Sequence, residues 1–423
     1  MKFRLLPVMF CFLFLLSFSV STVYSQELSI VKPEEVNLSK EKLDRITQVM
    51  QKYVDDNKIS GSVTLVARHG KTAHLEAVGM MDIESEKRMR IDTIFRIASM
   101  TKPITSVAVM MLYEEGHFLL ADPVSKYIHE FENSRVLVTA PASYEHSAAA
   151  GYALVPAKRE ITIRHLLNHT SGLSSRLWKR PYLDDMYKNT LGGERTVGEM
   201  VKKLAGLPLL HHPGDAFEYG LSTDVLAYLV EVVSGMTLDE FFMKRIFEPL
   251  GMKNTFFYVP DDKLSLLATL YGPNKDGGID PVQKNHRGSK TYFSGTGGLF
   301  STISDYSRFL QMMLNGGELD GVRLLSRKSV EIMTANSIGD LHSTWPQLHG
   351  DKFGLGFGIR TERGQYDELE SLGTYSWGGI FNTIFYVDPK EDMICIFMNQ
   401  LFPQDHLTVR RQFRVLAYQA IND

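Results

Sequence analysis

Segments with strand character lie near both ends of this sequence, and a long stretch with helical character separates them. Each segment is short, rich in β-branched and aromatic residues and bounded by turn-forming residues, which is typical of strands joined by turns. Six segments have this character, and they are residues 61–67, 74–79, 355–359, 374–377, 382–387 and 393–398. Because strands must pair to be stable, we expect the two ends of the chain to complete one sheet.

Helical spacing of apolar residues predicts helices beside and between these strands. One helix over residues 39–54 begins after Ser39, which is placed to cap it, and another over residues 406–421 closes the chain. Further helices are expected at residues 162–169, 197–204, 223–234, 238–246 and 304–314. Residues 133–158 have weak periodicity, so we predict a long loop there, near a cleft. The pattern as a whole predicts an α/β fold with an inserted all-α subdomain and a cleft where the two parts meet.

The overall composition is that of a packed globular protein. Hydrophobic residues make up 44% of the 423 residues and charged residues 22%, which fits neither a disordered chain nor a polytopic membrane protein. The 46 basic residues are balanced by 49 acidic ones, for a formal charge of -3. Since no basic surplus is left to neutralise a phosphate backbone, the charge argues against nucleic acid as a partner.

The first 25 residues have the features of a secretory signal peptide. Lys2 and Arg4 precede an apolar run over residues 5–20, and Ser25 ends a plausible cleavage site. The alternative is an uncleaved anchor, although the run is shorter than a bilayer span. Cleavage would leave residues 26–423 as a periplasmic or secreted protein that does not span a membrane. Cys395 would then be the single cysteine of the mature sequence, so no internal disulfide can form.

The strongest local signal for chemistry is a Ser-x-x-Lys motif at Ser99 and Lys102, just before an apolar helix over residues 104–113. At this spacing the two side chains lie on one face of a helix, so the amine can reach the hydroxyl. The apolar surroundings favour a neutral, basic lysine. The spacing alone leaves a catalytic nucleophile and a helix cap both open, because it also occurs at Ser39 and Lys42, where a cap and a solvated charge suffice.

With five further segments in the same order along the chain, this motif resembles the beta-lactamase-related branch of the penicillin-recognising serine hydrolases. That branch contains class C beta-lactamases, family VIII esterases and D-amino-acid peptidases. The further segments are residues 161–173 (ITIRHLLNHTSGL), 213–222 (PGDAFEYGLS), 297–302 (GGLFST), 353–358 (FGLGFG) and 377–380 (WGGI). The resemblance extends over about residues 34–418.

The resemblance implies a beta-lactamase/transpeptidase-like fold, in which an antiparallel sheet is flanked by helices and an all-α subdomain is inserted. We expect residues 26–423 to form one catalytic domain of this type. Its α/β part would comprise about residues 34–115 and 340–423, and its mainly helical part about residues 116–339.

The family roles transfer to matching positions of this sequence. The resemblance implies that Ser99 is the acylated nucleophile and that Lys102 tunes proton transfer. Tyr219, as phenolate or through Lys102, would take the serine proton and return it to the leaving group. It also implies that the backbone N–H groups of Ser99 and Ile380 form the oxyanion hole.

Two departures from the lactamase pattern bear on substrate choice. Leu221 stands where lactamases of this branch have an amide-binding Asn, and Trp377 stands where they commonly have a carboxylate-binding Lys. We expect Leu221, Trp377, Gly378 and Gly379 to contact substrate, and the neutral indole to favour an apolar ester. The preferred hypothesis is a carboxylic ester hydrolase of family VIII type.

Two alternatives stay open at this stage. One is a beta-lactamase or D-amino-acid peptidase, and the other is a binding protein for peptidoglycan-like ligands that is acylated without turnover. The expected partner is accordingly a small-molecule ester, a lactam or a D-amino-acid peptide.

No segment of the sequence calls for a cofactor or a metal. His165 and His169 are four residues apart, but Leu166 stands where a metalloprotease motif needs Glu, so capping or core hydrogen bonding by His169 is the simpler interpretation. Gly295, Gly297 and Gly298 lack both the dinucleotide-binding spacing and a P-loop Lys, so we expect them to form a tight bend near the cleft.

Overall fold

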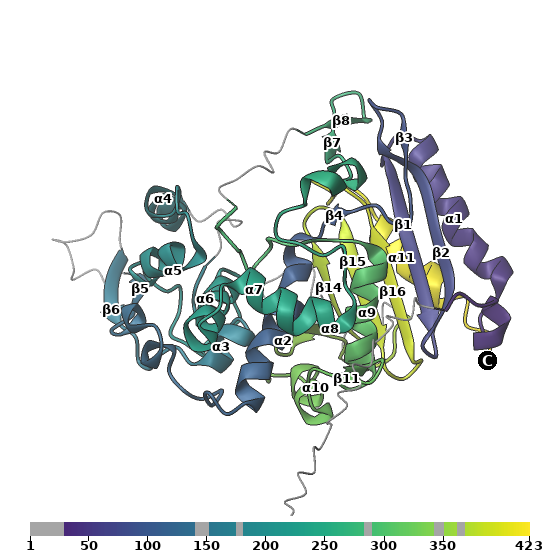
Figure 1. Cartoon of the computed structure of the whole chain (residues 1–423). Helices are drawn as coiled ribbons and strands as arrows, with labels where there is room; N and C mark the ends of the chain where they lie inside the picture. Colours follow the sequence, from purple (N-terminus) through teal and green to yellow (C-terminus); the bar gives the residue numbers. More distant parts are fainter. Residues whose placement is uncertain (1–28, 140–151, 175–180, 283–289, 342–350, 362–368) are drawn as a thin grey trace, which may run out of the picture.

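One eight-stranded antiparallel sheet organises the molecule, and strands from both ends of the chain build it. The computed structural model describes residues 29–139, 152–174, 181–282, 290–341, 351–361 and 369–423. The strand order is β12-β13-β14-β15-β16-β1-β2-β3, so β16 from the C-terminal end pairs with β1 from the N-terminal end. The predicted pairing of the two ends is thereby confirmed, as is the mixed α/β fold (Figure 1).

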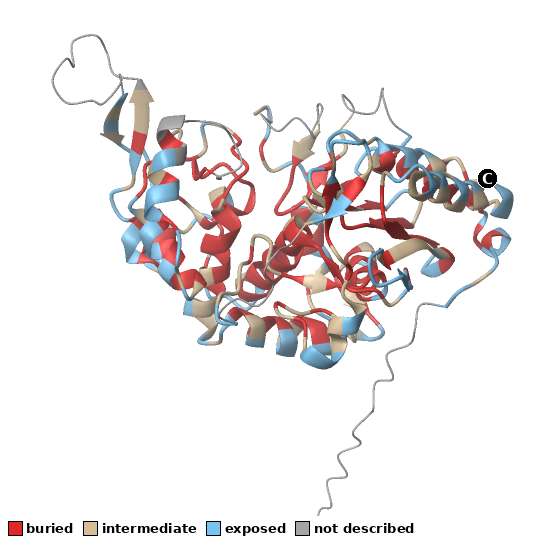
Figure 2. Ribbon diagram, turned by 90° about the horizontal axis from the view of Figure 1, so that it is seen from above, coloured by how far each residue is buried: buried red, intermediate tan, exposed pale blue. Residues whose placement is uncertain are grey.

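The strands of this sheet are β1 (Gly61–Arg68), β2 (Lys71–Asp82), β3 (Lys87–Arg88), β12 (Lys352–Phe353), β13 (Gly358–Ile359), β14 (Tyr375–Gly379), β15 (Thr383–Asp388) and β16 (Met393–Met398). Every residue of β1 and β16 is buried, because both faces of the sheet centre are covered by helices. Figure 2 shows these strands as the buried middle of one half of the molecule.

Helices from the two termini cover one face of the sheet. α1 (Lys40–Asp55) packs against β2 and against α11 (Val409–Tyr418), which in turn contacts β16. The Ser39 hydroxyl accepts the backbone N–H of Lys42 and caps α1 as predicted. On the other face, α9 (Ile303–Leu314) contacts β16, β15 and β1. α9 therefore lies against the sheet, although the sequence analysis places it in the mainly helical part.

A second group of helices forms the other half of the molecule (Figure 1). Its members are α3 (Ile163–Leu167), α4 (Pro181–Thr190), α5 (Val197–Ala205) and α6 (Ser222–Ser234). α7 (Leu238–Phe242) packs against α6, and α8 (Glu248–Leu250) contacts α9 beside the sheet. α10 (Arg327–Met333) lies apart from them, and α2 (Thr101–Glu114) packs against α6. Residues 101–112 of α2 are all buried, so this helix lies inside the molecule between sheet and helical group.

The prediction of a long loop at residues 133–158 is wrong for the part of this segment that the structure describes. β5 (Arg135–Thr139) and β6 (Tyr152–Pro156) pair as an antiparallel hairpin, with residues 140–151 outside the described part. This hairpin extends from the end of the helical group, away from the large sheet (Figure 1). The two apolar segments lie far enough apart in sequence that the polar, Ala-rich stretch between them hides the pairing from a periodicity reading.

The predicted strand at residues 355–359 is shorter in the structure. β13 contains Gly358 and Ile359 alone, because Gly356 turns the backbone with a φ of 102°. A Cβ at Gly356 would overlap the Ser106 hydroxyl of α2, so glycine is needed for the close approach. The predicted signal peptide lies outside the described residues. Among the residues that are described, no helix is both long and apolar enough to cross a membrane.

Candidate active site

Ser99 lies in a short 3-10 turn, Ala98–Met100, at the start of α2. Ala98 adopts left-handed backbone with a φ of 45°, which is unfavourable for a residue with a Cβ and is typical of positions that present a functional side chain. The Lys102 amine, one turn further on, lies 3.1 Å from Ser99 Oγ. The structure thus brings the two side chains of the Ser-x-x-Lys motif into hydrogen-bond contact.

Lys102 is buried, with 1% of its surface exposed. Its amine donates to the carbonyl oxygen of Thr296 at 2.9 Å and lies 4.6 Å from the centre of the Tyr219 ring. Burial lowers the pKa of Lys102 to about 7, and the buried carboxylate of Asp224 opposes this shift. Near neutral pH a large fraction of Lys102 is therefore an uncharged amine that can accept a proton.

Tyr219 lies in the loop before α6, and its hydroxyl has two hydrogen-bond partners in the site. Trp377 Nε1 of β14 donates to this oxygen at 3.2 Å, and Ser99 also hydrogen-bonds to it. Burial raises the pKa of Tyr219, and the hydrogen bonds with Ser99 and Trp377 only partly offset that effect. Tyr219 is thus a neutral phenol in the free protein. Of the two routes that the resemblance leaves open, this favours proton transfer through Lys102 over a phenolate.

These residues open into a pocket of about 380 Å³. Five described residues that line it were singled out from the sequence besides Ser99, namely Tyr219, Trp377, Gly378, Gly379 and Ile380. Leu221 is not among the described lining residues, because it is half-buried at the start of α6 with its side chain against the core.

Gly379 is the position where the sheet edge meets the serine turn. A Cβ there would overlap the carbonyl oxygen of Ile97, so β14 can approach the turn only through glycine. The turn that follows β14 closes with a hydrogen bond from Asn382 N to Gly379 O and carries Ile380. Arg410 of α11 holds this turn by donating to Gly379 O and to Asn382 Oδ1. The turn is thereby fixed against α11 at the mouth of the pocket.

The far wall of the pocket is charged, in contrast to the apolar site expected from Trp377. Arg360 pairs with Asp351 at 3.0 Å and with Glu370 at 3.3 Å, and Arg414 pairs with Glu370 at 2.7 Å. These arginines are thus engaged by the half-buried Asp351 and the buried Glu370, and Arg410 by the Gly379–Asn382 turn. The pocket combines an aromatic and glycine wall at Ser99 with a wall of internally paired charges.

The other residues weighed from sequence have structural roles in the described part. His165 Nδ1 accepts the backbone N–H of Thr162 and completes a capping box at α3. His169 is buried with its ring 4.8 Å from that of Tyr219. No group of three His, Cys, Asp or Glu side chains among the described residues is arranged to hold a metal ion. Residues 295–297 form the predicted tight bend, and Thr296 of this bend holds Lys102.

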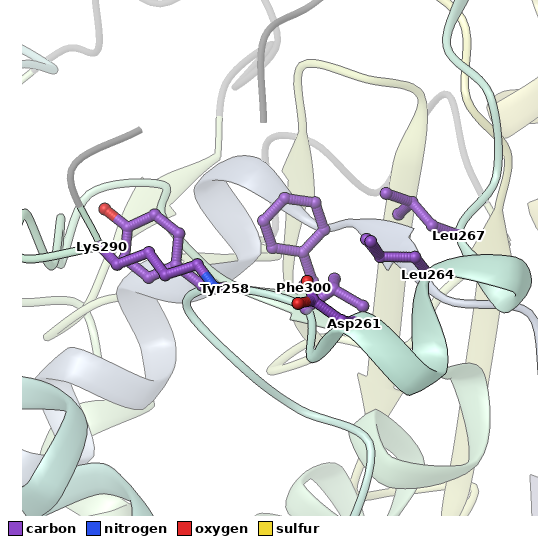
Figure 3. Close-up of a pocket in the computed structure, with 7 residues that line it drawn as sticks. Tyr258, Asp261, Leu264, Leu267, Lys290 and Phe300 are labelled. Carbon is purple, nitrogen blue, oxygen red and sulfur yellow. The ribbon is translucent and has the colours of Figure 1, made fainter. Parts of the chain in front are cut away.

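A second pocket, of about 420 Å³, lies beside residues 258–267 (Figure 3). Its described lining includes Tyr258, Leu264 and Phe300, together with the charged side chains of Asp261 and Lys290. None of Ser99, Lys102 and Tyr219 lines it. The chemistry therefore belongs to the smaller pocket at the serine turn.

One residue that supports Lys102 from behind, Asp224, is not predicted from the sequence. Asp224 is 2% exposed, and its carboxylate accepts the Ser294 hydroxyl at 2.8 Å and the backbone N–H of Thr296 at 3.0 Å. In the sequence Asp224 is an acid in the first turn of an apolar helix, a position that the helix dipole alone explains. Only the buried contacts distinguish it from such a helix-end charge.

Comparison with known proteins identifies the family. A family model described as beta-lactamase matches residues 46–419. The chain belongs to the beta-lactamase family. Among relatives of this beta-lactamase-family chain, protein Rv1367c of Mycobacterium tuberculosis is 33% identical over 85% of this chain and 90% of that protein. Esterase EstB of Burkholderia gladioli is 26% identical over 81% of this chain and 86% of that protein.

The solved structures agree with this family assignment. EstCE1, described as a hydrolase with promiscuous acyltransferase activity, superimposes with a TM-score of 0.76 at 26% identity, over 89% of this chain and 99% of that chain. The expected beta-lactamase/transpeptidase-like fold is confirmed, and the protein is a serine hydrolase of the beta-lactamase family. The roles predicted for individual residues stay predictions.

Proposed function

We propose that this protein hydrolyses carboxylic esters of small or medium acyl groups through acylation of Ser99. The observation that carries the proposal is the buried cluster in which Lys102 contacts Ser99 and Trp377 donates to the Tyr219 hydroxyl. Similarity to esterase EstB and to the hydrolase EstCE1 supports the same substrate class. Ester hydrolysis by a family VIII type of mechanism is thus the function that the site favours.

Acylation would begin with the uncharged amine of Lys102. As Ser99 Oγ attacks the ester carbonyl carbon, the amine accepts the serine proton and becomes an ammonium. The backbone N–H groups of Ser99 and Ile380 would stabilise the oxyanion, and the contact of Gly379 with Ile97 supports this arrangement. The positive charge of the new Lys102 ammonium then stabilises the negative charge that develops in the transition state.

Collapse of the tetrahedral intermediate breaks the bond to the alcohol. Tyr219 would donate its proton to the leaving oxygen and recover one from the Lys102 ammonium, which leaves both groups as they began. Water then attacks the acyl-enzyme, its proton passes to the same pair, and Ser99 recovers a proton as the carboxylic acid departs. Each half of the cycle returns Lys102 and Tyr219 to their starting forms, because the serine proton leaves with the alcohol and a proton of the attacking water restores Ser99.

The choice of ester over lactam or D-peptide is supported by the absence of an available cation at the position of Trp377. The indole N–H is directed to Tyr219, and the arginines of the far wall are held by carboxylates or by backbone. The charges of Arg360 and Arg414 are therefore compensated by carboxylates, and the guanidinium of Arg410 is occupied by the oxygens of Gly379 and Asn382. A neutral ester needs no cation in the pocket for its binding.

A paired assay tests the proposal. Short-chain p-nitrophenyl esters and a chromogenic cephalosporin are compared on the mature protein and on Ser99→Ala. We expect serine-dependent ester turnover with little lactam cleavage. Preferred lactam cleavage would overturn the ester assignment in favour of a lactamase or peptidase, and a single burst of product without turnover would indicate an acylated binding protein.

We also propose export, with cleavage after Ser25. The support is the basic start and the apolar run of residues 5–20. Mass spectrometry of the N-terminus after expression in a bacterium with a secretion pathway should give a chain that begins at Gln26. A chain that retains residues 1–25 and sediments with membranes would instead establish an anchor.

A further inference from the structure

Asp224 is a buried acidic residue that the mechanism above does not use. It lies in the first turn of α6, and one of its oxygens, Oδ1, accepts hydrogen bonds from Ser294 Oγ and Thr296 N. Both donors belong to the bend that precedes β9 (Phe300–Ser301). A neutral acceptor would satisfy these two donors equally well, so the hydrogen bonds alone do not account for a buried charge.

The bend held by Asp224 is clamped between two helices. Thr105 Oγ1 of α2 donates to Gly295 O at 2.9 Å. A Cβ at Gly295 would lie 2.6 Å from Ala227 Cβ and 3.0 Å from Thr223 O, so glycine lets the bend lie directly on α6. The next carbonyl, that of Thr296, receives the Lys102 amine. One residue thus links the two groups, since Thr296 binds the carboxylate through its N–H and the amine through its carbonyl.

We propose that Asp224 is a positioning residue for the acylation of Ser99, which anchors the Thr296 carbonyl against the Lys102 amine and supplies a buried negative charge behind it. This inference rests on the proposed ester hydrolysis and adds to it the group that controls its base.

The titratable groups around Lys102 define the expected pH effect. Tyr219 faces the amine from the loop before α6 and His169 from the segment after α3, and both are uncharged at neutral pH because burial disfavours their ions. Ser99 is a neutral hydroxyl. Burial raises the pKa of the Asp224 carboxyl, and its hydrogen bonds from Ser294 and Thr296 and the charge of Lys102 oppose that shift. In its ionised form Asp224 is the neighbour that favours the ammonium form of Lys102. Removing that charge should let the amine lose its proton at lower pH.

The test is the pH dependence of single-turnover acylation by p-nitrophenyl acetate. The acidic limb of the profile is the pH range in which the rate rises as Lys102 loses its proton. In Asp224→Asn, which keeps an acceptor for Ser294 and Thr296, this limb should move to lower pH by about one unit. At one unit below the wild-type midpoint, the rate relative to its own alkaline plateau should rise about fivefold. Asp224→Glu keeps the charge and should keep the wild-type limb. A limb in Asp224→Asn that coincides with wild type, or moves to higher pH, would overturn the proposal, as would an equal shift in both variants.

Ser294→Ala provides a second test that does not alter the charge. Loss of one hydrogen bond to Asp224 should loosen the bend and lower kcat several-fold with KM and the acidic limb unchanged. If Asp224→Asn does not fold, an unchanged kcat in Ser294→Ala overturns the anchoring role. A wild type that releases no Ser99-dependent p-nitrophenolate is a different outcome, because it contradicts ester hydrolysis itself and not the role of Asp224.

Discussion

Two segments of the chain share the Ser-x-x-Lys spacing at the start of a helix, and they differ in what surrounds them. At α1 the Ser39 hydroxyl accepts the backbone N–H of Lys42, and this lysine is only half-buried. At α2 the Ser99 hydroxyl contacts the side-chain amine of Lys102, which is buried. The same four-residue spacing therefore makes a helix cap in one place and a candidate nucleophile with its base in the other.

The comparison shows that burial, and not spacing, gives the lysine its chemistry. At α1 the serine hydroxyl is used to satisfy one of the free N–H groups of the first helical turn. α2 is enclosed, and its start has no side-chain cap. An enclosed amine loses hydration, which favours its uncharged form, whereas a hydrated amine stays an ammonium at neutral pH.

Matched alanine substitutions at the two serines should give the largest contrast. Ser99→Ala should lower ester turnover on the order of 10³-fold or more, because it removes the attacking atom. Ser39→Ala should leave turnover within about twofold of wild type, since it lies on the opposite face of the sheet. Steady-state kinetics with p-nitrophenyl esters measure both. More than a few per cent residual activity in Ser99→Ala would assign the nucleophile elsewhere.

Alanine substitutions at the two lysines should differ nearly as much in their effect on the acylation rate. Lys102→Ala should depress acylation on the order of 10³-fold, whereas Lys42→Ala should have little effect. Adding Tyr219→Phe to Lys102→Ala should depress the rate less than the product of the two single effects, because both residues serve one proton path. Rapid-mixing measurements of acylation would reveal this coupling, and independent effects would contradict the shared path.

The pH profile of the wild type should reflect the buried lysine. Because burial lowers the pKa of Lys102 to about 7, its ammonium form predominates below that pH and its neutral form above it. The value of kcat/KM for a neutral ester should therefore rise with pH through about 7 and then level off. A profile that is flat between about pH 5 and 8 would exclude an amine of this kind as the base.

The smallest expected effect concerns stability at the other motif. Ser39→Ala should lower the free energy of unfolding by about 1 kcal/mol, because the backbone N–H of Lys42 loses its cap. Urea unfolding at neutral pH would measure it, with Lys42→Ala as the control that keeps the cap. Equal stabilities of Ser39→Ala and wild type would show that this hydroxyl is not needed at the helix start.

Local patterns in the sequence determined the helices at both ends, the central strands and the order of the family motifs. Each of these depends on residues close together in the chain, such as the apolar spacing of α1 or the turn between β1 and β2. The hairpin of β5 and β6 was not predicted because a long segment separates its two strands. The end of the predicted strand at Gly356 was not predicted because it depends on close contact with Ser106 of a distant helix.

The tertiary structure alone decided how the candidate residues act on one another. Trp377 and Tyr219 are far apart in the sequence, as are Asp224 and Thr296, yet each pair is joined by a hydrogen bond. The pKa of Lys102 likewise follows from its enclosure between α2, α6 and the bend at Thr296. Sequence names the groups that can carry charge, and packing sets which of them keep it, because desolvation depends on every neighbour in space.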